Sequence, residues 1–221
     1  GTSAPELLVS LVSAIKGSSG IAVGNVVGSN IANIGLILGL TSIICPIETD
    51  NRKVIANGAV MILASLLLML FALNSGISRT EGITLFLCLI IFTIVSIKKG
   101  RTQDQEIDTE DNQQEKTMPI LAALGLIILS CGMLAFGADI LVDGATTLAS
   151  AMGVSDKVIG LTIVALGTSL PELAASVAAA FKKQMDISIG NIIGSNIFNT
   201  LCVLGVSTSI KPIPLTFGDI R

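Results

Sequence analysis

The chain contains no histidine, no tryptophan and no tyrosine, and only 13% of its residues are charged. The lack of histidine excludes imidazole proton relays, Ser-His dyads and most transition-metal sites. The lack of tryptophan and tyrosine removes the aromatic belt that marks the edges of many membrane proteins. The cysteines lie far apart, without disulfide or zinc spacing, and are expected to pack in apolar surroundings; they are Cys45, Cys88, Cys131 and Cys202.

Long apolar runs dominate the rest of the chain. Hydrophobic residues make up 51% of it and the mean hydropathy is +0.83, which favours an integral membrane protein. We therefore predict an all-α membrane protein with polytopic transmembrane helices. Six runs are near or above the length needed to cross about 30 Å of hydrocarbon, at residues 21–45, 54–73, 82–97, 119–151, 158–181 and 187–210.

The two ends of the chain and the longest apolar run allow further predictions. Residues 6–15 are too short to cross alone, and Gly1 is not an initiator Met, so we expect the chain to be incomplete at both ends. The run 119–151 exceeds a perpendicular crossing, which predicts a helix that is tilted or projects from the bilayer. Its Asp139 and Asp143 are candidate site residues, but a position near a membrane surface is favoured because charge costs less there.

The chain contains an internal repeat. A shift of 166 residues aligns 1–46 with 167–212 without a gap, and 21 of the 46 pairs are identical. GTSAPE and GNVVGSNIAN in the first copy match GTSLPE and GNIIGSNIFN in the second. A duplication of this quality indicates two related structural units.

The polar segments indicate how the two units are oriented. Residues 98–118 are rich in Asp, Glu, Gln and Lys and predict a solvated linker; a calcium-sensing role for its acids is disfavoured, since it has no EF-hand-like ligand pattern. Alternating the spans places eight basic residues on the linker side, which favours that side as cytoplasmic, against Lys16, Arg79, Lys157, Lys211 and Arg221 on the other. The repeated spans are then five crossings apart, so the repeat is inverted, which is typical of secondary transporters.

The repeated motif combines helix-breaking and oxygen-bearing residues. Pro5 and Pro171 each lack an N–H and crowd the carbonyl four residues back, so we expect unpaired carbonyls at Gly1 and Gly167. A glutamate in mid-span costs some 2.5 kcal/mol or more and indicates function. Carbonyl, hydroxyl and carboxylate oxygens together are the ligands of hard cations such as Ca²⁺ and Na⁺.

The helix after each break supplies a second set of oxygens. Ser29 and Asn33 are four residues apart and share a helical face, as do Ser195 and Asn199. The glycine pairs Gly24/Gly28 and Gly190/Gly194 predict close helix–helix packing. For the remaining asparagines, an interhelical role and a site role are equally compatible with the pattern; they are Asn25, Asn30, Asn191 and Asn196.

The doubled motif resembles the two alpha-repeats of the cation/calcium exchanger superfamily, most closely its bacterial and archaeal sodium/calcium exchanger branch. The resemblance implies an inverted-repeat exchanger fold, with a first membrane half at 1–97, a linker at 98–118 and a second half at 119–221. It implies cation coordination by Thr2, Ser3, Glu6, Ser29 and Asn33 in the first repeat and by Thr168, Ser169, Glu172, Ser195, Asn199 and the carbonyl of Ala165 in the second.

The charge of this site favours exchange of Ca²⁺ for Na⁺. Two ionised glutamates carry minus two, which one Ca²⁺ or two Na⁺ neutralise, so the ions compete for the same oxygens. A calcium/proton exchanger is disfavoured because neither GSN helix carries an acid, and a channel filter would be a ring across subunits. An intramembrane hydrolase using Ser3 or Ser169 would lack a base.

These features lead to further expectations about partners and location. We expect a transporter and not an enzyme, with Ca²⁺ and Na⁺ as transported ions, no cofactor and no nucleic acid as partner. The lipid bilayer is the expected surrounding, in a prokaryotic plasma (inner) membrane.

Overall fold

The computed structural model describes residues 1–17, 19–47, 51–73, 76–107, 119–153 and 160–214, and most of them are helical. Residues 1–107 form α1 (Ala4–Lys16), α2 (Ser19–Ala32), the π-helical turn η1 (Asn33–Ile37), α3 (Leu38–Ile44), α4 (Asn51–Ala72), β1 (Gly76–Ile77) and α5 (Arg79–Ile107). Residues 119–214 form α6 (Ile120–Ala151), η2 (Gly160–Val164), α8 (Ala165–Thr168), α9 (Leu170–Phe181), α10 (Met185–Phe198), η3 (Asn199–Val203), α11 (Leu204–Ile210) and β2 (Ile213–Pro214).

Four described helices are long and apolar enough to span a membrane, or five if one bent pair is counted as a span. The four are 20–44, 54–72, 79–98 and 185–210, and the bent pair joins 162–168 to 170–181 at 47°. They agree with the predicted spans to within a few residues. The remaining predicted span, 119–151, is the single 32-residue helix α6, about 48 Å long at 1.5 Å per residue.

The predicted linker differs from the structure at its start. We expected solvated chain from residue 98, but α5 continues to Ile107. Gln, Glu, Lys and Arg are good helix formers, so the helix begun in the apolar run continues into polar sequence. Residues 108–118 lie outside the described part of the chain.

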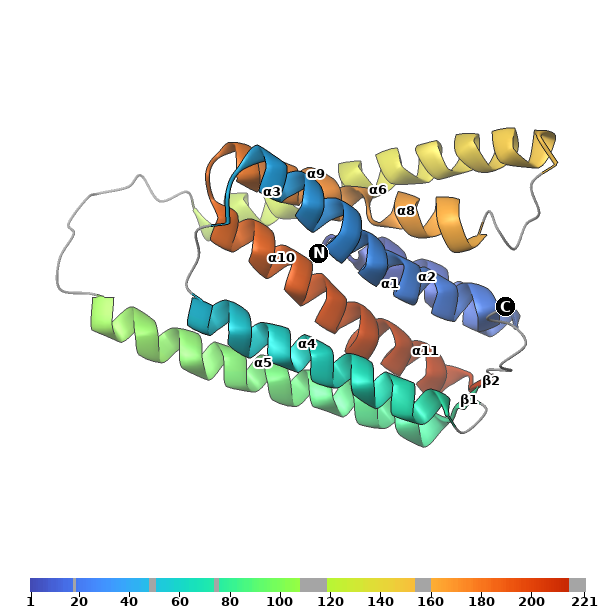
Figure 1. Ribbon diagram of the computed structural model, residues 1–221, viewed down its shortest axis with the longest axis horizontal. Coiled ribbons are helices and arrows are strands. Elements are labelled where there is room, and N and C mark those ends of the chain that lie inside the picture. The colour runs from blue at the N-terminus through green and yellow to red at the C-terminus, as the bar shows by residue number, and fades with distance from the viewer. Residues whose placement is uncertain (18, 48–50, 74–75, 108–118, 154–159, 215–221) are drawn as a thin grey trace.

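The helices are arranged side by side in an elongated bundle (Figure 1). α4 and α5 cover one side of α10 and α11, and α6 lies with α8 and α9 on the other side. β1 pairs with β2 in antiparallel fashion, and Lys211 Nζ donates to the carbonyl oxygen of Ile15 at 2.9 Å. Lys16, Arg79 and Lys211 therefore lie at one end of the bundle, as the alternation of spans predicted for them; Lys157 and Arg221 lie outside the described residues.

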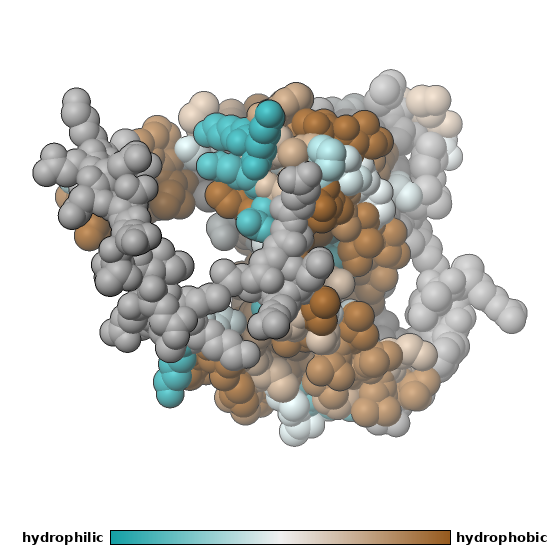
Figure 2. Space-filling view, turned by 60° about the vertical axis from the view of Figure 1, so that its left-hand side comes forward, coloured by the Kyte–Doolittle hydropathy of each residue, from teal (hydrophilic) through white to brown (hydrophobic). Residues whose placement is uncertain are grey.

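The distribution of polarity is opposite to that of a water-soluble domain. Leu121 is 85% and Ile43 83% exposed, whereas Glu6 and Asn33 are completely buried. Apolar side chains cover most of the described surface in Figure 2. Because exposed apolar area is stable in lipid and buried polar groups need partners, the interior of this bundle is where its chemistry lies.

Candidate cation site between the two repeats

The helix break predicted at Pro171 is present, since 162–168 and 170–181 meet at an angle of 47°. Pro5 and Pro171 are in the first turns of α1 and α9. The expected unpaired carbonyls are wrong, because Ala4 N–H donates to Gly1 O at 3.2 Å and Gly167 O accepts an N–H at the end of α8. The carbonyl that faces side-chain hydroxyls is that of Ala165. Ser29 Oγ lies 3.3 Å from this oxygen and Thr168 Oγ1 3.1 Å from it.

The two glutamates are bonded by serines of the opposite repeat. Ser3 Oγ donates to Glu172 Oε1 at 2.6 Å, and Ser169 Oγ donates to Glu6 Oε1 at 3.2 Å. Both carboxylates are 0% exposed. Ser3 and Ser169 are equivalent positions of the two repeats, as are Glu6 and Glu172, so the two bonds are related by symmetry. The two repeated segments therefore face each other across a local pseudo-two-fold axis.

Serine and threonine hydroxyls of α2, α8 and α10 complete the polar surface. Ser195 Oγ lies 3.4 Å from Glu172 Oε1, and Ser29 Oγ lies 3.3 Å from Thr168 Oγ1. Thr168 also donates to Asn25 Oδ1 at 3.1 Å. The hydroxyl of Ser195 on α10 therefore reaches a carboxylate, while Ser29 on α2 and Thr168 on α8 bond to each other beside it.

A second reciprocal pair links the asparagines. Asn33 Nδ2 donates to Asn196 Oδ1 at 2.8 Å, and Asn199 Nδ2 donates to Asn30 Oδ1 at 3.2 Å. Asn33 and Asn199 are the first residues of the π-helical turns η1 and η3, which are 166 positions apart like the repeats. Such turns often mark functional sites in helices.

Buried oxygens without a partner are concentrated at these residues. Among the described side chains, six buried polar atoms make no hydrogen bond. Four of them are acceptors at matched positions of the two repeats, and they are Glu6 Oε2, Glu172 Oε2, Asn33 Oδ1 and Asn199 Oδ1. A buried acceptor without a partner is costly, so these four atoms are suited to binding a cation.

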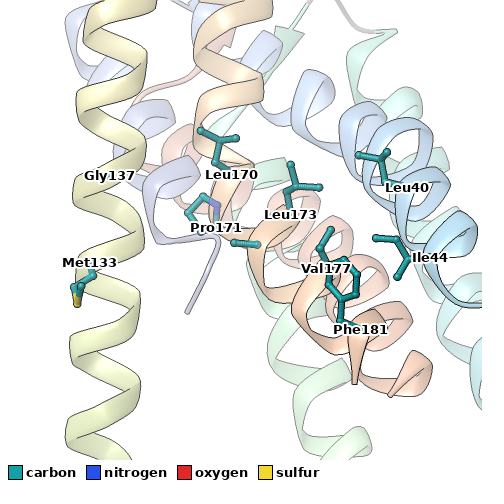
Figure 3. A pocket seen from close by; sticks show the side chains of 10 residues that line it. Leu40, Ile44, Met133, Gly137, Leu170, Pro171, Leu173, Val177 and Phe181 are labelled. Atoms are coloured by element: carbon teal, nitrogen blue, oxygen red, sulfur yellow. The ribbon is translucent and has the colours of Figure 1, made fainter. Parts of the chain in front are cut away.

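Two cavities adjoin the helix breaks, and only one of them has polar walls. The smaller, ≈ 240 Å³, is lined by Gly1, Thr2, Ser3, Gly190, Asn191, Gly194, Ser195 and Phe198. The larger, ≈ 580 Å³, lies between α3, α6 and α9 and has apolar walls including Pro171 and Val177 (Figure 3). Helix α9 thus presents Pro171 to an apolar space and the adjacent Glu172 to the polar interior.

The predicted role of one glycine pair is wrong. A Cβ added to Gly190 or Gly194 would have no neighbouring atom within 4 Å, so these glycines do not mark a close helix contact. They line the polar cavity beside Ser3 instead. The close approach occurs between α5 and α11, where a Cβ on Gly205 would lie 3.1 Å from Gly82 O.

Ten of the eleven predicted ligand residues are buried, and the other, Thr2, is partly exposed. Contacts between the repeats bring together Ser3 with Glu172, Ser169 with Glu6, and Ser29 with Ala165 and Thr168. Asn33 and Asn199 bond instead to Asn196 and Asn30. The role of all eleven residues as cation ligands stays a prediction.

Other candidate residues lie apart from this network or were not predicted. Asp143 is exposed on α6, and the side chain of Asp139 is outside the described set. The described cysteines Cys45, Cys88 and Cys202 are free, and Cys45 and Cys88 pack against apolar clusters; the side chain of Cys131 lies outside the described set. Sequence reasoning missed Ser10 and Ser176, which accept from Asn25 and Asn191 at 2.9 and 3.0 Å; their identity in both repeats was the available signal.

The chemistry of the site is that of hard-cation binding. Within the described residues, no group of three or more His, Cys, Asp or Glu side chains could hold a metal ion. The polar interior instead combines two carboxylates with hydroxyl, amide and backbone oxygens, which suits Na⁺ or Ca²⁺ and not a soft metal. Apolar helices, an inverted repeat and a buried oxygen-lined site together define a secondary cation transporter.

Comparison with known proteins identifies the family. The family model described as sodium/calcium exchanger protein matches residues 1–98 and 122–218. The chain belongs to this family, and its general activity is cation/calcium antiport. The predicted superfamily and inverted-repeat fold are confirmed.

Individual relatives and a solved structure agree with this assignment. The chain is 41% identical over 215 residues to the putative antiporter CaxA of Alkalimonas amylolytica, covering 96% of the chain and 67% of the relative. It is 35% identical over 217 residues to the inner membrane protein YrbG of Escherichia coli, and the match covers 96% of this chain and 67% of YrbG. A structure of the sodium-calcium exchanger NCX_Mj, soaked with Na⁺ and Sr²⁺, has a TM-score of 0.79 and 36% identity, covering 100% of this chain and 71% of that one. The chain is an integral protein of a prokaryotic inner membrane.

Proposed function

We propose that this chain forms the ion-binding centre of an antiporter that exchanges Ca²⁺ for Na⁺ by alternating access. The ligands are the residues of the two helix breaks and the two following helices. They are Thr2, Ser3, Glu6, Ser29, Asn33, the carbonyl of Ala165, Thr168, Ser169, Glu172, Ser195 and Asn199.

The observation that carries this proposal is the set of four unpaired oxygens on Glu6, Glu172, Asn33 and Asn199. Each repeat supplies one carboxylate and one amide, so neither repeat makes the site alone. Ca²⁺ takes six to eight oxygens, and the neighbouring hydroxyls can supply the remainder.

Charge explains why two ions compete for one site. Two ionised glutamates carry minus two, which one Ca²⁺ or two Na⁺ compensate. In a site of low dielectric the binding of one ion opposes the binding of the other, and exchange follows when the site opens to one side at a time. We assign the polar cavity next to Ser3 and Ser195 as the path by which ions reach the site from one side of the membrane.

The test is Ca²⁺ uptake by vesicles that contain the full-length protein. We expect uptake driven by a sodium gradient and little uptake driven by a proton gradient alone. Uptake driven only by protons would reject sodium coupling, and uptake without either gradient would reject antiport. Empty vesicles and a Glu6→Gln/Glu172→Gln double variant are the controls.

A further inference from the structure

The bonds between asparagines point to residues that act on the site without touching the ion. We infer that Asn30 and Asn196 are positioning residues that turn the amide oxygens of Asn199 and Asn33 toward the transported cation. This inference rests on the proposed function, because it assumes that the unpaired oxygens bind the ion.

The argument begins with the two ends of an amide. An asparagine side chain carries an acceptor oxygen and an NH₂ donor at nearly equivalent positions, so rotation by a half turn exchanges them. The oxygen binds a cation, whereas the NH₂ group repels it and donates to carboxylates. A ligand asparagine therefore needs a partner that holds its nitrogen away from the site.

Each candidate ligand has such a partner in the opposite repeat. Asn196 Oδ1 accepts from Asn33 Nδ2 at 2.8 Å, and the free end of Asn33 is the unpaired Oδ1. Asn33 begins η1, which packs against α9, the helix that carries Glu172. The bond to Asn196 thus keeps the NH₂ group of Asn33 occupied while its oxygen is left available on the buried side.

The other repeat shows the same arrangement. Asn30 Oδ1 accepts from Asn199 Nδ2 at 3.2 Å, and Asn199 Oδ1 is unpaired and buried. Asn199 begins η3, which packs against α1, the helix that carries Glu6. Two independent instances related by the repeat make a chance packing contact a poor explanation.

The positioning residues are themselves held to different degrees. Asn30 Nδ2 donates to Thr200 Oγ1 at 3.1 Å, and Thr200 is 1% exposed. Asn196 Nδ2 lies 3.5 Å from both Asn30 O and Met61 Sδ, which are long contacts. The residue equivalent to Thr200 in the first repeat is Ile34, so a hydroxyl anchor exists for Asn30 and not for Asn196.

The test measures calcium affinity in the full-length protein, as the KM for sodium-driven Ca²⁺ uptake and by titration with CaCl₂. We expect Asn196→Ala to weaken Ca²⁺ binding by about 10–100-fold, the usual effect of removing a residue that orients a metal ligand. Without its partner, Asn33 can turn its NH₂ group toward Glu172. Asn57→Ala removes an exposed amide from α4, away from the asparagine pairs and the polar cavity, and serves as the control with little expected change.

A second background separates positioning from packing. Asn33→Asp presents an oxygen whichever way the side chain turns, so Asn196→Ala should cost no further affinity when combined with it. Thr200→Val should weaken Ca²⁺ binding less than Asn30→Ala, and Asn199→Asp should remove both effects. Thermal unfolding of each variant confirms that the comparison is between folded proteins.

The outcomes distinguish this inference from the proposed function. A loss of affinity from Asn196→Ala that is equal in the unmodified protein and in the Asn33→Asp variant overturns the positioning role. An affinity that Asn196→Ala leaves unchanged in the unmodified protein overturns it too. Both results leave the proposed function intact if exchange still requires Glu6 and Glu172. Exchange that is insensitive to Glu172→Gln overturns the proposed site and the positioning role together.

Discussion

Glu6 and Glu172 are acidic residues that are buried and occupy equivalent positions in the two repeats. Each is completely buried, has one oxygen bonded to a serine of the other repeat and has one oxygen unpaired. A carboxylate in this setting needs a positive partner, and no described lysine or arginine is buried with it. A cation from solution can fill that role, and two carboxylates favour a divalent one.

The glutamates give the first prediction. Replacing either by Gln keeps an oxygen acceptor but lowers the charge of the site from minus two to minus one. We expect Ca²⁺ affinity to fall by more than about tenfold, because each close charge contact is worth several kcal/mol even at an effective dielectric of about 20. Na⁺ binding should fall less, since one Na⁺ is still neutralised.

The measurement is Ca²⁺ and Na⁺ affinity in folded, inserted full-length protein. Asn33→Ala and Asn199→Ala remove neutral dipoles and should weaken Ca²⁺ binding less than either Gln variant. Near-normal calcium exchange in both Gln variants would mean that the site lies elsewhere, with Asp139 and Asp143 the next carboxylates to replace.

The helix pair α5 and α11 shows how small residues set the geometry of an element. A Cβ on Gly82 would meet the Thr208 hydroxyl, Ser209 N at 2.8 Å and Gly205 O at 2.9 Å. Backbone atoms cannot move aside as side chains can, so the two helices must separate if Gly82 gains a side chain. α11 continues directly from η3, which begins at Asn199, and a shift of α11 therefore affects the candidate site.

The second prediction follows from this close contact. We expect Gly82→Ala to lower the free energy of unfolding by about 1–3 kcal/mol, the usual cost of overpacking. Gly58→Ala in α4 is the control, because nothing lies within 4 Å of its Cβ position and alanine favours helix. Thermal unfolding in detergent compares the two, and equal stability of both variants would contradict the tight α5–α11 contact.

The third prediction concerns the direction of the repeated helices. Lys16 and Lys182 occupy equivalent positions in the two repeats, at the ends of α1 and α9, and both are exposed. In an inverted repeat they lie on opposite sides of the membrane, with Lys182 on the cytoplasmic side. Single cysteines at these positions, in a background without the four native cysteines, should react with an impermeant thiol reagent from opposite sides. Labelling of both from one side would reject the predicted topology.

At the scale of the whole molecule, the site is also a junction between two halves. Hydrogen bonds at the site join residues 163–169 positions apart in sequence, and the surface around them is largely apolar (Figure 2). A bound cation would add further contacts between α1 and α9, which come from different repeats. Ion binding should therefore stabilise the entire fold and not a single helix.

The fourth prediction is that removing the ions destabilises the protein. A ligand at 100 times its Kd adds about 2.7 kcal/mol to the free energy of unfolding. We expect the midpoint temperature to rise with added CaCl₂ and fall with a chelator in sodium-free buffer. The Glu6→Gln/Glu172→Gln double variant should show little response, and a response equal to that of the unmodified protein would place the stabilising ion at another site.

The sequence alone determined the membrane class, the spans, the repeat and the kinds of oxygen in the site. Hydropathy is a local property, so an apolar run of sufficient length predicts a spanning helix wherever it packs. The prolines likewise predicted the breaks, because a missing N–H acts within one helical turn. Residues 98–107 departed from the predicted spans, since a helix can continue past the end of its apolar run.

The tertiary structure decided which residues meet. Whether Ser3 bonds to Glu6 or Glu172, which carbonyl faces the hydroxyls, and which way the Asn33 amide turns depend on the crossing of helices far apart in sequence. Periodicity assigns a residue to a face of its own helix but does not state which helix that face contacts. For the same reason, Gly190 and Gly194 read as packing residues in the sequence, whereas in the fold they line the cavity beside Ser3.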